Sequence, residues 1–221
     1  MTEYTQRREA MVASQIERRG IDDPLVLDAM RSVPREVFVP EHLRNEAYGD
    51  WPLPIGAGQT ISQPYIVAYM IAALELDGGE KALEIGSGSG YAAAIMATIA
   101  SHVYGIERIA MLAEQSARNL AAAGCDNVTI RCADGTRGWP EEAPFDAILV
   151  SAGAPDVPQT LKEQLAVGGR MVVPVGEDPH AQDLVRVTRI GDDEWSEETM
   201  TAVRFVPLIG LQGWDAGADR R

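Results

Sequence analysis

The sequence predicts an α/β fold with a doubly wound, mostly parallel seven-stranded sheet and an N-terminal helical extension. Three observations support this prediction. From Lys81 onward, short apolar runs alternate with helical segments, which is the pattern of βαβ units. A glycine-rich turn directly follows the first run. The last two runs are joined by the acidic segment GDDEWSEE, which indicates an antiparallel ending.

The apolar runs and the segments between them give the expected order of elements in the sheet. Parallel strands are expected over 82–86, 102–107, 127–133, 145–152 and 170–176. Helices are expected between them over 89–100, 109–123 and 157–166, and the two closing strands over 184–190 and 201–209.

The residues before the sheet predict helices separated by prolines. A helix over 5–19 is expected to stop at Gly20, and a second helix to begin at the acidic cap and proline of Asp22-Asp23-Pro24. Residues 34–57 contain four prolines and predict irregular structure with one short helix. A further helix is expected over 64–76.

Composition excludes several classes of function. The net charge of −14 disfavours a nucleic-acid partner, because such proteins usually carry a basic stripe that neutralises phosphates. We expect a soluble cytoplasmic protein, because there is neither a basic-then-apolar leader nor an apolar stretch of the roughly 20 residues that a membrane helix needs. The two cysteines and three histidines show no metal-site spacing, so we expect no metal.

The stretch ALEIGSGSGYAAA (82–94) predicts a strand, a glycine turn and the start of a helix. Gly86 and Gly88 allow a ligand to lie against the backbone, although such a turn also occurs without a ligand. Tyr91 stands where a dinucleotide fingerprint has its last glycine. Glu84 would repel a pyrophosphate but could hold an ammonium group. S-adenosyl-L-methionine has an amino group, a sulfonium and no phosphate, so it suits this turn.

Two further strand ends carry acceptors for the same ligand. Glu107 ends the second strand, where an acidic side chain takes the ribose hydroxyls of a nucleoside cofactor. Asp134-Gly135 ends the third strand and could accept from an adenine amino group. Because three strand ends converge on one adenosine-shaped ligand, the sequence favours a methyltransferase over a dehydrogenase.

The order of several motifs closely resembles the protein-L-isoaspartate O-methyltransferases. These motifs are AYGDWPLPIGAGQTISQPYIVA, LEIGSGSGY, GIERI, ADGTRGWPEEAPFDAILVSAGAPDVP, GGRMVVPVG and VRFVPLIG. The GQTISQP stretch and the VRFVPL ending are the most specific of them, and the resemblance covers nearly the whole chain. Ser87 stands where threonine is common in the family, and Thr136 where bacterial members often have tryptophan.

The resemblance implies a Rossmann-like class I S-adenosylmethionine-dependent methyltransferase that acts on L-isoaspartyl residues of damaged proteins and peptides and starts their repair through a succinimide. It implies that Ser62 is the active-site residue. The cofactor-binding residues are then expected to be Thr60, Ile61, Glu84, Gly86, Ser87, Gly88, Glu107, Arg108, Asp134 and Gly135. A single domain is expected, with helices and the substrate-side loop in 1–78, the core in 79–210 and a tail in 211–221.

Ser62 is also a candidate on physical grounds alone. Followed by Pro64, it is expected to cap the helix that begins there, with its hydroxyl oxygen accepting from the backbone. The hydroxyl hydrogen could then point outward to a carboxylate, which gives local capture of an anion on an acidic protein. A carboxylate is ionised at neutral pH, so no general base is expected.

Some alternatives stay open at this stage. A methyltransferase for another carboxylate or a small molecule would share every cofactor feature, and a nicotinamide enzyme or a non-catalytic binding module would share some of them. Arg204 is a candidate for steadying the substrate main chain, and Trp214 with the tail for covering the site. We expect a monomer, because the sequence shows no long apolar surface helix.

Overall fold

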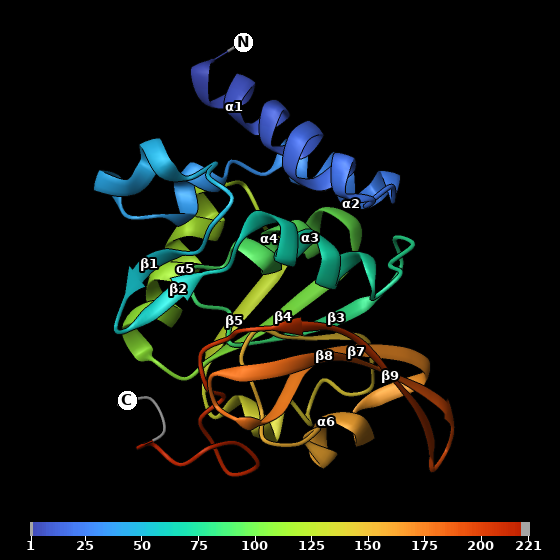
Figure 1. Ribbon diagram of the computed structural model, residues 1–221. Coiled ribbons are helices and arrows are strands. Elements are labelled where there is room, and N and C mark those ends of the chain that lie inside the picture. The colour runs from blue at the N-terminus through green and yellow to red at the C-terminus, as the bar shows by residue number, and fades with distance from the viewer. Residues whose placement is uncertain (1, 218–221) are drawn as a thin grey trace.

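The computed structural model describes residues 2–217 and contains the predicted seven-stranded sheet (Figure 1). The strands are β3 (Lys81–Ile85), β4 (His102–Glu107), β5 (Val128–Cys132), β6 (Phe145–Val150), β7 (Leu165–Asp178), β8 (Ala181–Gly191) and β9 (Glu194–Val203). Their order is β5-β4-β3-β6-β7-β8-β9. The pairs from β5 to β7 are parallel, and β8 and β9 are antiparallel to their neighbours. The predicted mixed sheet is confirmed.

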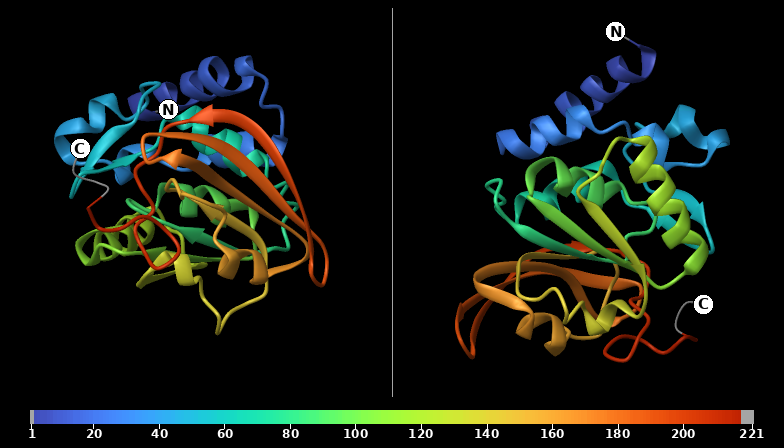
Figure 2. Two further views of the ribbon diagram at one scale, coloured as in Figure 1. Left: turned by 60° about the horizontal axis from the view of Figure 1, so that its bottom comes forward. Right: turned by 180° about the vertical axis from the view of Figure 1, so that it is seen from behind.

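Helices cover both faces of the sheet because its central strands are apolar on both sides. On β3, Ala82 packs under the N-terminal helices, whereas Leu83 and Ile85 pack into the core on the opposite face. The first face carries α3 (Pro64–Ala72), α4 (Tyr91–Ile99) and α5 (Ala110–Ala122), and the second carries α6 (Gln159–Glu163). The right-hand view of Figure 2 shows the helices on the two faces of the sheet from behind.

The N-terminal third confirms the predicted helix boundaries at two places. The first helical stretch consists of α1 (Glu3–Met11) followed by a π-helical and a 3₁₀ turn, and it stops at Gly20 with φ +93°. The next helix is α2 (Pro24–Ser32), in which the Asp23 carboxylate accepts from the N–H groups of the first turn. The end of the first stretch follows the rule that helices often stop at a glycine in the left-handed conformation, and the start of α2 follows the rule for acidic N-caps.

Residues 34–61 contain more regular structure than the prolines suggest. Two 3₁₀ turns, Arg35–Phe38 and Glu41–Glu46, are followed by a hairpin of β1 (Leu53–Gly56) and β2 (Gln59–Ile61). The prediction of irregular structure up to residue 57 is therefore wrong for the hairpin. Its turn runs through Gly56, Ala57 and Gly58, all at positive φ. Two glycines at such a spacing are a sequence signal for a hairpin turn, which the neighbouring prolines obscured.

Two other predicted boundaries are corrected. The helix expected over 64–76 ends at Ala72, and Glu75 adopts φ +51°, which is incompatible with a continuing helix. The closing strand expected over 201–209 overlaps β9 only at residues 201–203, because β9 begins at Glu194 and ends at Val203. The acidic segment therefore belongs mostly to a strand, and only a tight turn separates β8 from β9.

Within residues 2–217, no helix combines the length and the apolar character that crossing a bilayer requires.

Candidate functional site

The predicted site residues gather around the carboxyl ends of β3, β4 and β5, beside β2 and the residue that follows it. Strands β4 and β6 flank β3 on opposite sides, so the chain order reverses at β3 and leaves a crevice there. Three adjoining hollows occupy this region. We call them the inner pocket, around Glu84 and Ser89, the side pocket, around Glu107 and Gly135, and the outer cleft, around Gln63 and Phe205.

The turn after β3 requires glycine at defined positions. Gly86 and Gly88 have φ of +80° and +52°, and both line the inner and the side pocket. A Cβ on Gly88 would lie 3.2 Å from the Cδ1 atom of Ile55, so the β1–β2 hairpin packs directly on the turn. The hairpin therefore closes one wall of the site and brings Thr60 and Ile61 to it.

Glu84 lies in the inner pocket and is only 1% exposed. Its Oε1 accepts a hydrogen bond of 3.1 Å from the Ser151 hydroxyl. Burial raises the pKa of Glu84 to about 8, and the nearby carboxylate of Glu107 acts in the same direction. The Glu84 Oε2 atom and the Ser87 hydroxyl, which also lines this pocket, are buried without a hydrogen-bond partner among the described residues.

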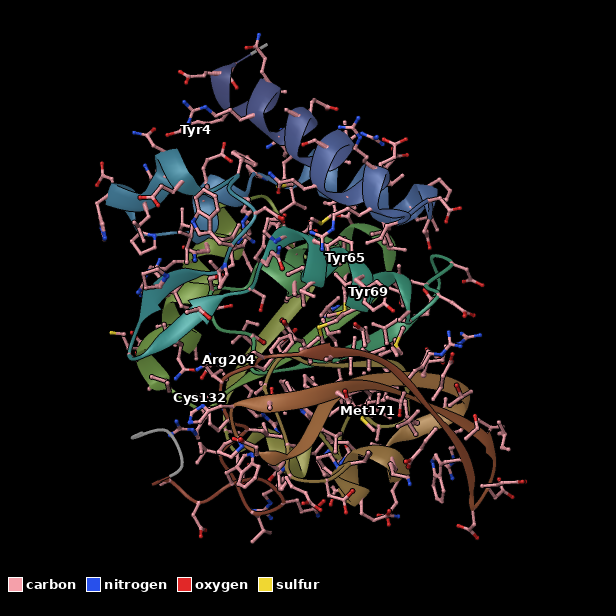
Figure 3. The ribbon with its side chains drawn as sticks, in the orientation of Figure 1. Tyr4, Tyr65, Tyr69, Cys132, Met171 and Arg204 are labelled. Atoms are coloured by element: carbon pink, nitrogen blue, oxygen red, sulfur yellow. The ribbon has the colours of Figure 1, made fainter. Side chains whose placement is uncertain are left out.

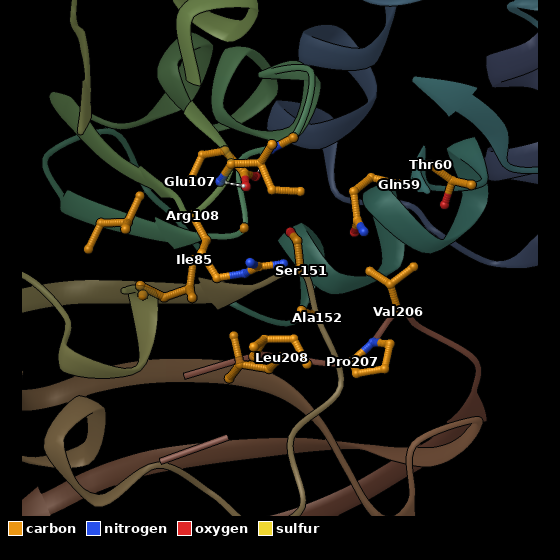
Figure 4. Close-up of a pocket in the computed structure, with 16 residues that line it drawn as sticks. Gln59, Thr60, Ile85, Glu107, Arg108, Ser151, Ala152, Val206, Pro207 and Leu208 are labelled. Atoms are coloured by element: carbon orange, nitrogen blue, oxygen red, sulfur yellow. Dashed lines mark hydrogen bonds between the residues drawn. The ribbon is translucent and has the colours of Figure 1, made fainter. Parts of the chain in front are cut away.

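Glu107 is held rigidly at the end of β4, where it lines the side pocket (Figure 4). Its Oε2 accepts from the Gly88 N–H at 2.9 Å, and its Oε1 accepts from the Ile109 N–H at 2.8 Å. Each carboxylate oxygen keeps a free lone pair for a ligand hydroxyl. Arg108 lines the same pocket, and Figure 4 shows its side chain directed into it.

Asp134 is the one predicted cofactor residue that lines none of the three hollows, although Gly135 beside it lines the side pocket. Its Oδ1 accepts from both the N–H and the hydroxyl of Thr136, and its Oδ2 accepts from the Leu211 N–H at 3.0 Å. Burial alone would raise the pKa of Asp134, but these hydrogen bonds outweigh it and lower the pKa. The carboxylate thus anchors the segment after Gly210.

The expectation that Ser62 caps α3 is wrong. The helix begins at Pro64, its N-cap is Gln63, and no side chain caps it. The Ser62 hydroxyl makes no hydrogen bond to a described residue, while the Ser62 carbonyl accepts from Arg35 Nη2 at 2.8 Å. Because Ser62 lines both the inner pocket and the outer cleft, its hydroxyl is free to serve a ligand at their shared wall.

The outer cleft has a volume of about 590 Å³. Among the described residues that line it, none is Asp or Glu, whereas Arg204 and His180 are present. Figure 3 shows Arg204 where the chain leaves β9, on the side of the molecule that carries the β1–β2 hairpin. On a chain with a net charge of −14, this cleft is locally suited to an anion.

Several residues of the site were missed at the sequence level. Ser151 follows β6 and lines all three hollows, and the rule that polar residues at parallel strand ends converge could have found it. Residues 206–209 also line the side pocket, because Gly153 after β6 pairs with Pro207. That pairing joins segments distant in the chain and has no local sequence signal.

The chemistry of the pockets fits a ligand with an ammonium group, ribose hydroxyls and no phosphate. The unpaired Glu84 oxygen and Ser87 hydroxyl suit an ammonium group, because buried polar atoms normally have partners. Glu107 offers acceptors to hydroxyls. No Lys or Arg is among the described residues lining the inner pocket. Residues 2–217 contain no group of three or more His, Cys, Asp or Glu that could hold a metal ion.

Comparisons with known proteins point to one family. The family described as "Protein-L-isoaspartate(D-aspartate) O-methyltransferase (PCMT)" matches residues 6–213. The chain is 62% identical to protein-L-isoaspartate O-methyltransferase 1 of Rhodopseudomonas palustris, covering 96% of this chain and 87% of that protein. It is 59% identical to protein-L-isoaspartate O-methyltransferase 2 of Marinobacter nauticus, covering 94% of each.

Solved structures agree with the sequence matches. A structure described as a protein-L-isoaspartate O-methyltransferase superposes with a TM-score of 0.83 at 30% identity, covering 93% of this chain and 67% of that one. A second structure, described as a "putative protein-L-isoaspartate O-methyltransferase beta-aspartate methyltransferase (PCMT)" from Plasmodium falciparum in complex with S-adenosyl-L-homocysteine, gives a TM-score of 0.78 at 30% identity. It covers 91% of this chain and 98% of its own.

Proposed function

The chain belongs to the protein-L-isoaspartate O-methyltransferase family, and from this premise we propose that Ser62 positions the substrate carboxylate for methyl transfer. The enzyme methylates the free α-carboxylate of L-isoaspartyl residues in damaged proteins and peptides, which initiates repair through a succinimide. One observation carries the proposal for Ser62: it lines both the pocket that contains Glu84 and the cleft that opens beside Arg204.

The cofactor is S-adenosyl-L-methionine, which supplies an electrophilic methyl group on a sulfonium. We propose that Glu84 and Ser87 bind its ammonium end and that Glu107 binds its ribose hydroxyls. Gly135 and Arg108 would border the adenosine in the side pocket. Asp134 would support the cofactor site without contacting the cofactor. Its carboxylate holds the segment that directly follows residues 206–209 of the pocket wall.

The substrate carboxylate, which accepts the methyl group, needs orientation and partial dehydration rather than deprotonation. A carboxylate is ionised at neutral pH and is already a nucleophile. The Ser62 hydroxyl would donate to one carboxylate oxygen and leave the other directed at the wall shared with the inner pocket. Holding the two reactants in this arrangement makes the displacement effectively unimolecular. The absence of Asp and Glu from the described lining of the outer cleft avoids repulsion of the substrate.

The test compares Ser62→Ala with Ser62→Thr, which keeps a hydroxyl. We expect Ser62→Ala to lower kcat/KM for an isoaspartyl peptide by about 10- to 100-fold, the effect of losing a hydrogen bond to a charged group. The Kd for the cofactor should stay unchanged, and Ser62→Thr should recover part of the activity. Ser14→Ala, at an exposed serine of the first helical stretch, is the control. Undiminished turnover by Ser62→Ala would remove Ser62 from the mechanism.

We further propose that the enzyme is a cytoplasmic monomer without a nucleic-acid partner and that its residues form one methyltransferase domain. The net charge of −14 and the unpaired thiols of Cys125 and Cys132 support this assignment, since reducing compartments favour free thiols. Light scattering behind a size-exclusion column tests the monomer directly. A mass near twice 23.9 kDa would contradict it.

A further inference from the structure

Behind Ser62 lies a completely buried arginine that the mechanism above does not use. Arg35, the first residue of the 3₁₀ turn Arg35–Phe38, is 0% exposed. Its Nε donates to the Ala47 carbonyl at 2.7 Å, and its Nη2 donates to the Ser62 carbonyl at 2.8 Å. One guanidinium therefore joins the end of the second 3₁₀ turn to the loop that carries Ser62.

The same guanidinium also contacts the start of α4. The Arg35 Cζ atom lies 4.7 Å from the ring centroid of Tyr91, which is 1% exposed and also lines the inner pocket. Tyr91 directly follows the glycine turn, since Gly90 is the N-cap of α4. Arg35 thus lies between the loop on the substrate side and the helix on the cofactor side.

The charge of Arg35 is not neutralised by a described carboxylate. Its described partners are two carbonyls and an aromatic face, and its Nη1 has no hydrogen-bond partner among the described residues. Burial lowers the pKa of Arg35, but a guanidinium stays protonated in proteins. An unpaired buried charge is costly, so a purely structural role would be better served by a neutral side chain.

We propose that Arg35 is a positioning residue for methyl transfer: it fixes the Ser62 loop, and its buried positive charge favours an anionic carboxylate at Ser62. This inference rests on the proposed role of Ser62. The charge is effective because it acts through the protein interior, where screening by water and salt is weak. It supplies the local attraction that an acidic chain needs at its substrate site.

The experiment uses Arg35→Lys, which keeps the charge but cannot make both hydrogen bonds, and Arg35→Met, which loses both. We expect kcat/KM for an isoaspartyl peptide to fall about 10-fold in Arg35→Lys and about 100-fold in Arg35→Met. The Kd for S-adenosyl-L-methionine should stay within about twofold of the wild type in both variants. In Arg35→Ala, added methylguanidinium should restore part of the turnover.

The control is Gln15→Leu, which removes a partly buried hydrogen bond from Gln15 Nε2 to the Tyr48 carbonyl in the same N-terminal region. It should lower the melting temperature without changing the kinetics. Arg35 variants that resemble Gln15→Leu, with lower stability but unchanged kcat/KM, would overturn the inference. Ser62→Ala is assayed alongside: if it is fully active, the proposed role of Ser62 fails, whereas inactive Ser62→Ala with active Arg35→Met refutes only the inference.

A measurement on the unaltered protein covers the case in which no Arg35 variant folds. The guanidinium signals of Arg35 are followed by NMR while an isoaspartyl peptide is added, with the matching aspartyl peptide as the control. A shift with the isoaspartyl peptide only supports the proposal. An unchanged signal at saturating isoaspartyl peptide contradicts it.

Discussion

At the scale of single residues, the site depends on polar groups that are buried and incompletely paired. Glu84, Ser87 and Arg35 each have a buried polar atom without a partner among the described residues. Such groups cost stability and are retained where a ligand or a charge needs them. The sequence could identify Glu84 because a polar residue interrupts an apolar strand, but Arg35 carried no such signal in its proline-rich segment.

The pKa of Glu84 predicts how stability varies with pH. Because the folded pKa of about 8 lies above the ordinary value of 4.5, the folded ligand-free protein binds more protons than the unfolded chain between these values. Stability should therefore fall as pH rises from about 5 to about 8. The part of this loss due to Glu84 is on the order of a few kcal/mol and should vanish in Glu84→Gln.

Chemical denaturation of the ligand-free protein at several pH values checks this prediction. Identical pH dependence in the wild type and in Glu84→Gln would contradict it. The same variant should bind S-adenosyl-L-methionine about 10- to 100-fold more weakly, because an amide, unlike Glu84, cannot ionise to pair with the ammonium group. Isothermal titration measures that loss, and equal affinity would show that Glu84 does not bind the ammonium group.

At the scale of elements, prediction succeeded where local rules act alone. The strand His102–Glu107 was predicted to the residue, and α2 begins within the predicted Asp22-Asp23-Pro24 segment, because apolar runs and caps mark them. The early start of β9 could not be read from the sequence. Its residues are mostly exposed, so no alternation of buried and exposed side chains marks them, and the strand exists because it pairs with β8.

The glycine turn allows a matched test of element packing. Gly90 and Gly124 have similar φ of +89° and +78°, but a Cβ on Gly90 would lie 2.6 Å from the Ser116 Oγ, whereas nothing lies within 4 Å at Gly124. Gly124→Ala should cost about 1 kcal/mol of stability through backbone strain. Gly90→Ala should cost about 1–3 kcal/mol more through overpacking. Stability is measured by urea denaturation. If both variants lose the same stability, the Ser116 side chain moves away from the added methyl group without an energetic penalty, which would contradict the prediction.

At the scale of the whole molecule, the site joins segments that no local pattern relates. The hairpin packs on the turn after β3, and the segment after β9 returns to β5, where Asp134 holds the Leu211 N–H. The resemblance to a family supplied the position of Ser62, but only the fold shows that it lies between two hollows. The expected capping role failed because Gln63, not Ser62, is the helix N-cap.

The net charge of −14 predicts opposite salt effects on two substrates. An isoaspartyl peptide with acidic flanking residues is repelled at long range, so its kcat/KM should rise about two- to fivefold between about 10 mM and 150 mM salt as the Debye length shrinks. A peptide with basic flanking residues should respond in the opposite sense. The same response from both peptides would show that long-range charge does not govern capture.

One measurement tests the central claim most directly. Two peptides that differ only in one aspartyl or isoaspartyl linkage are incubated with the enzyme and methyl-labelled S-adenosyl-L-methionine, and base-labile methyl ester is counted for the wild type and for Ser62→Ala. The account predicts ester on the isoaspartyl peptide alone, reduced by about 10- to 100-fold in the variant. Ester on both peptides, or equal ester from both proteins, would contradict it.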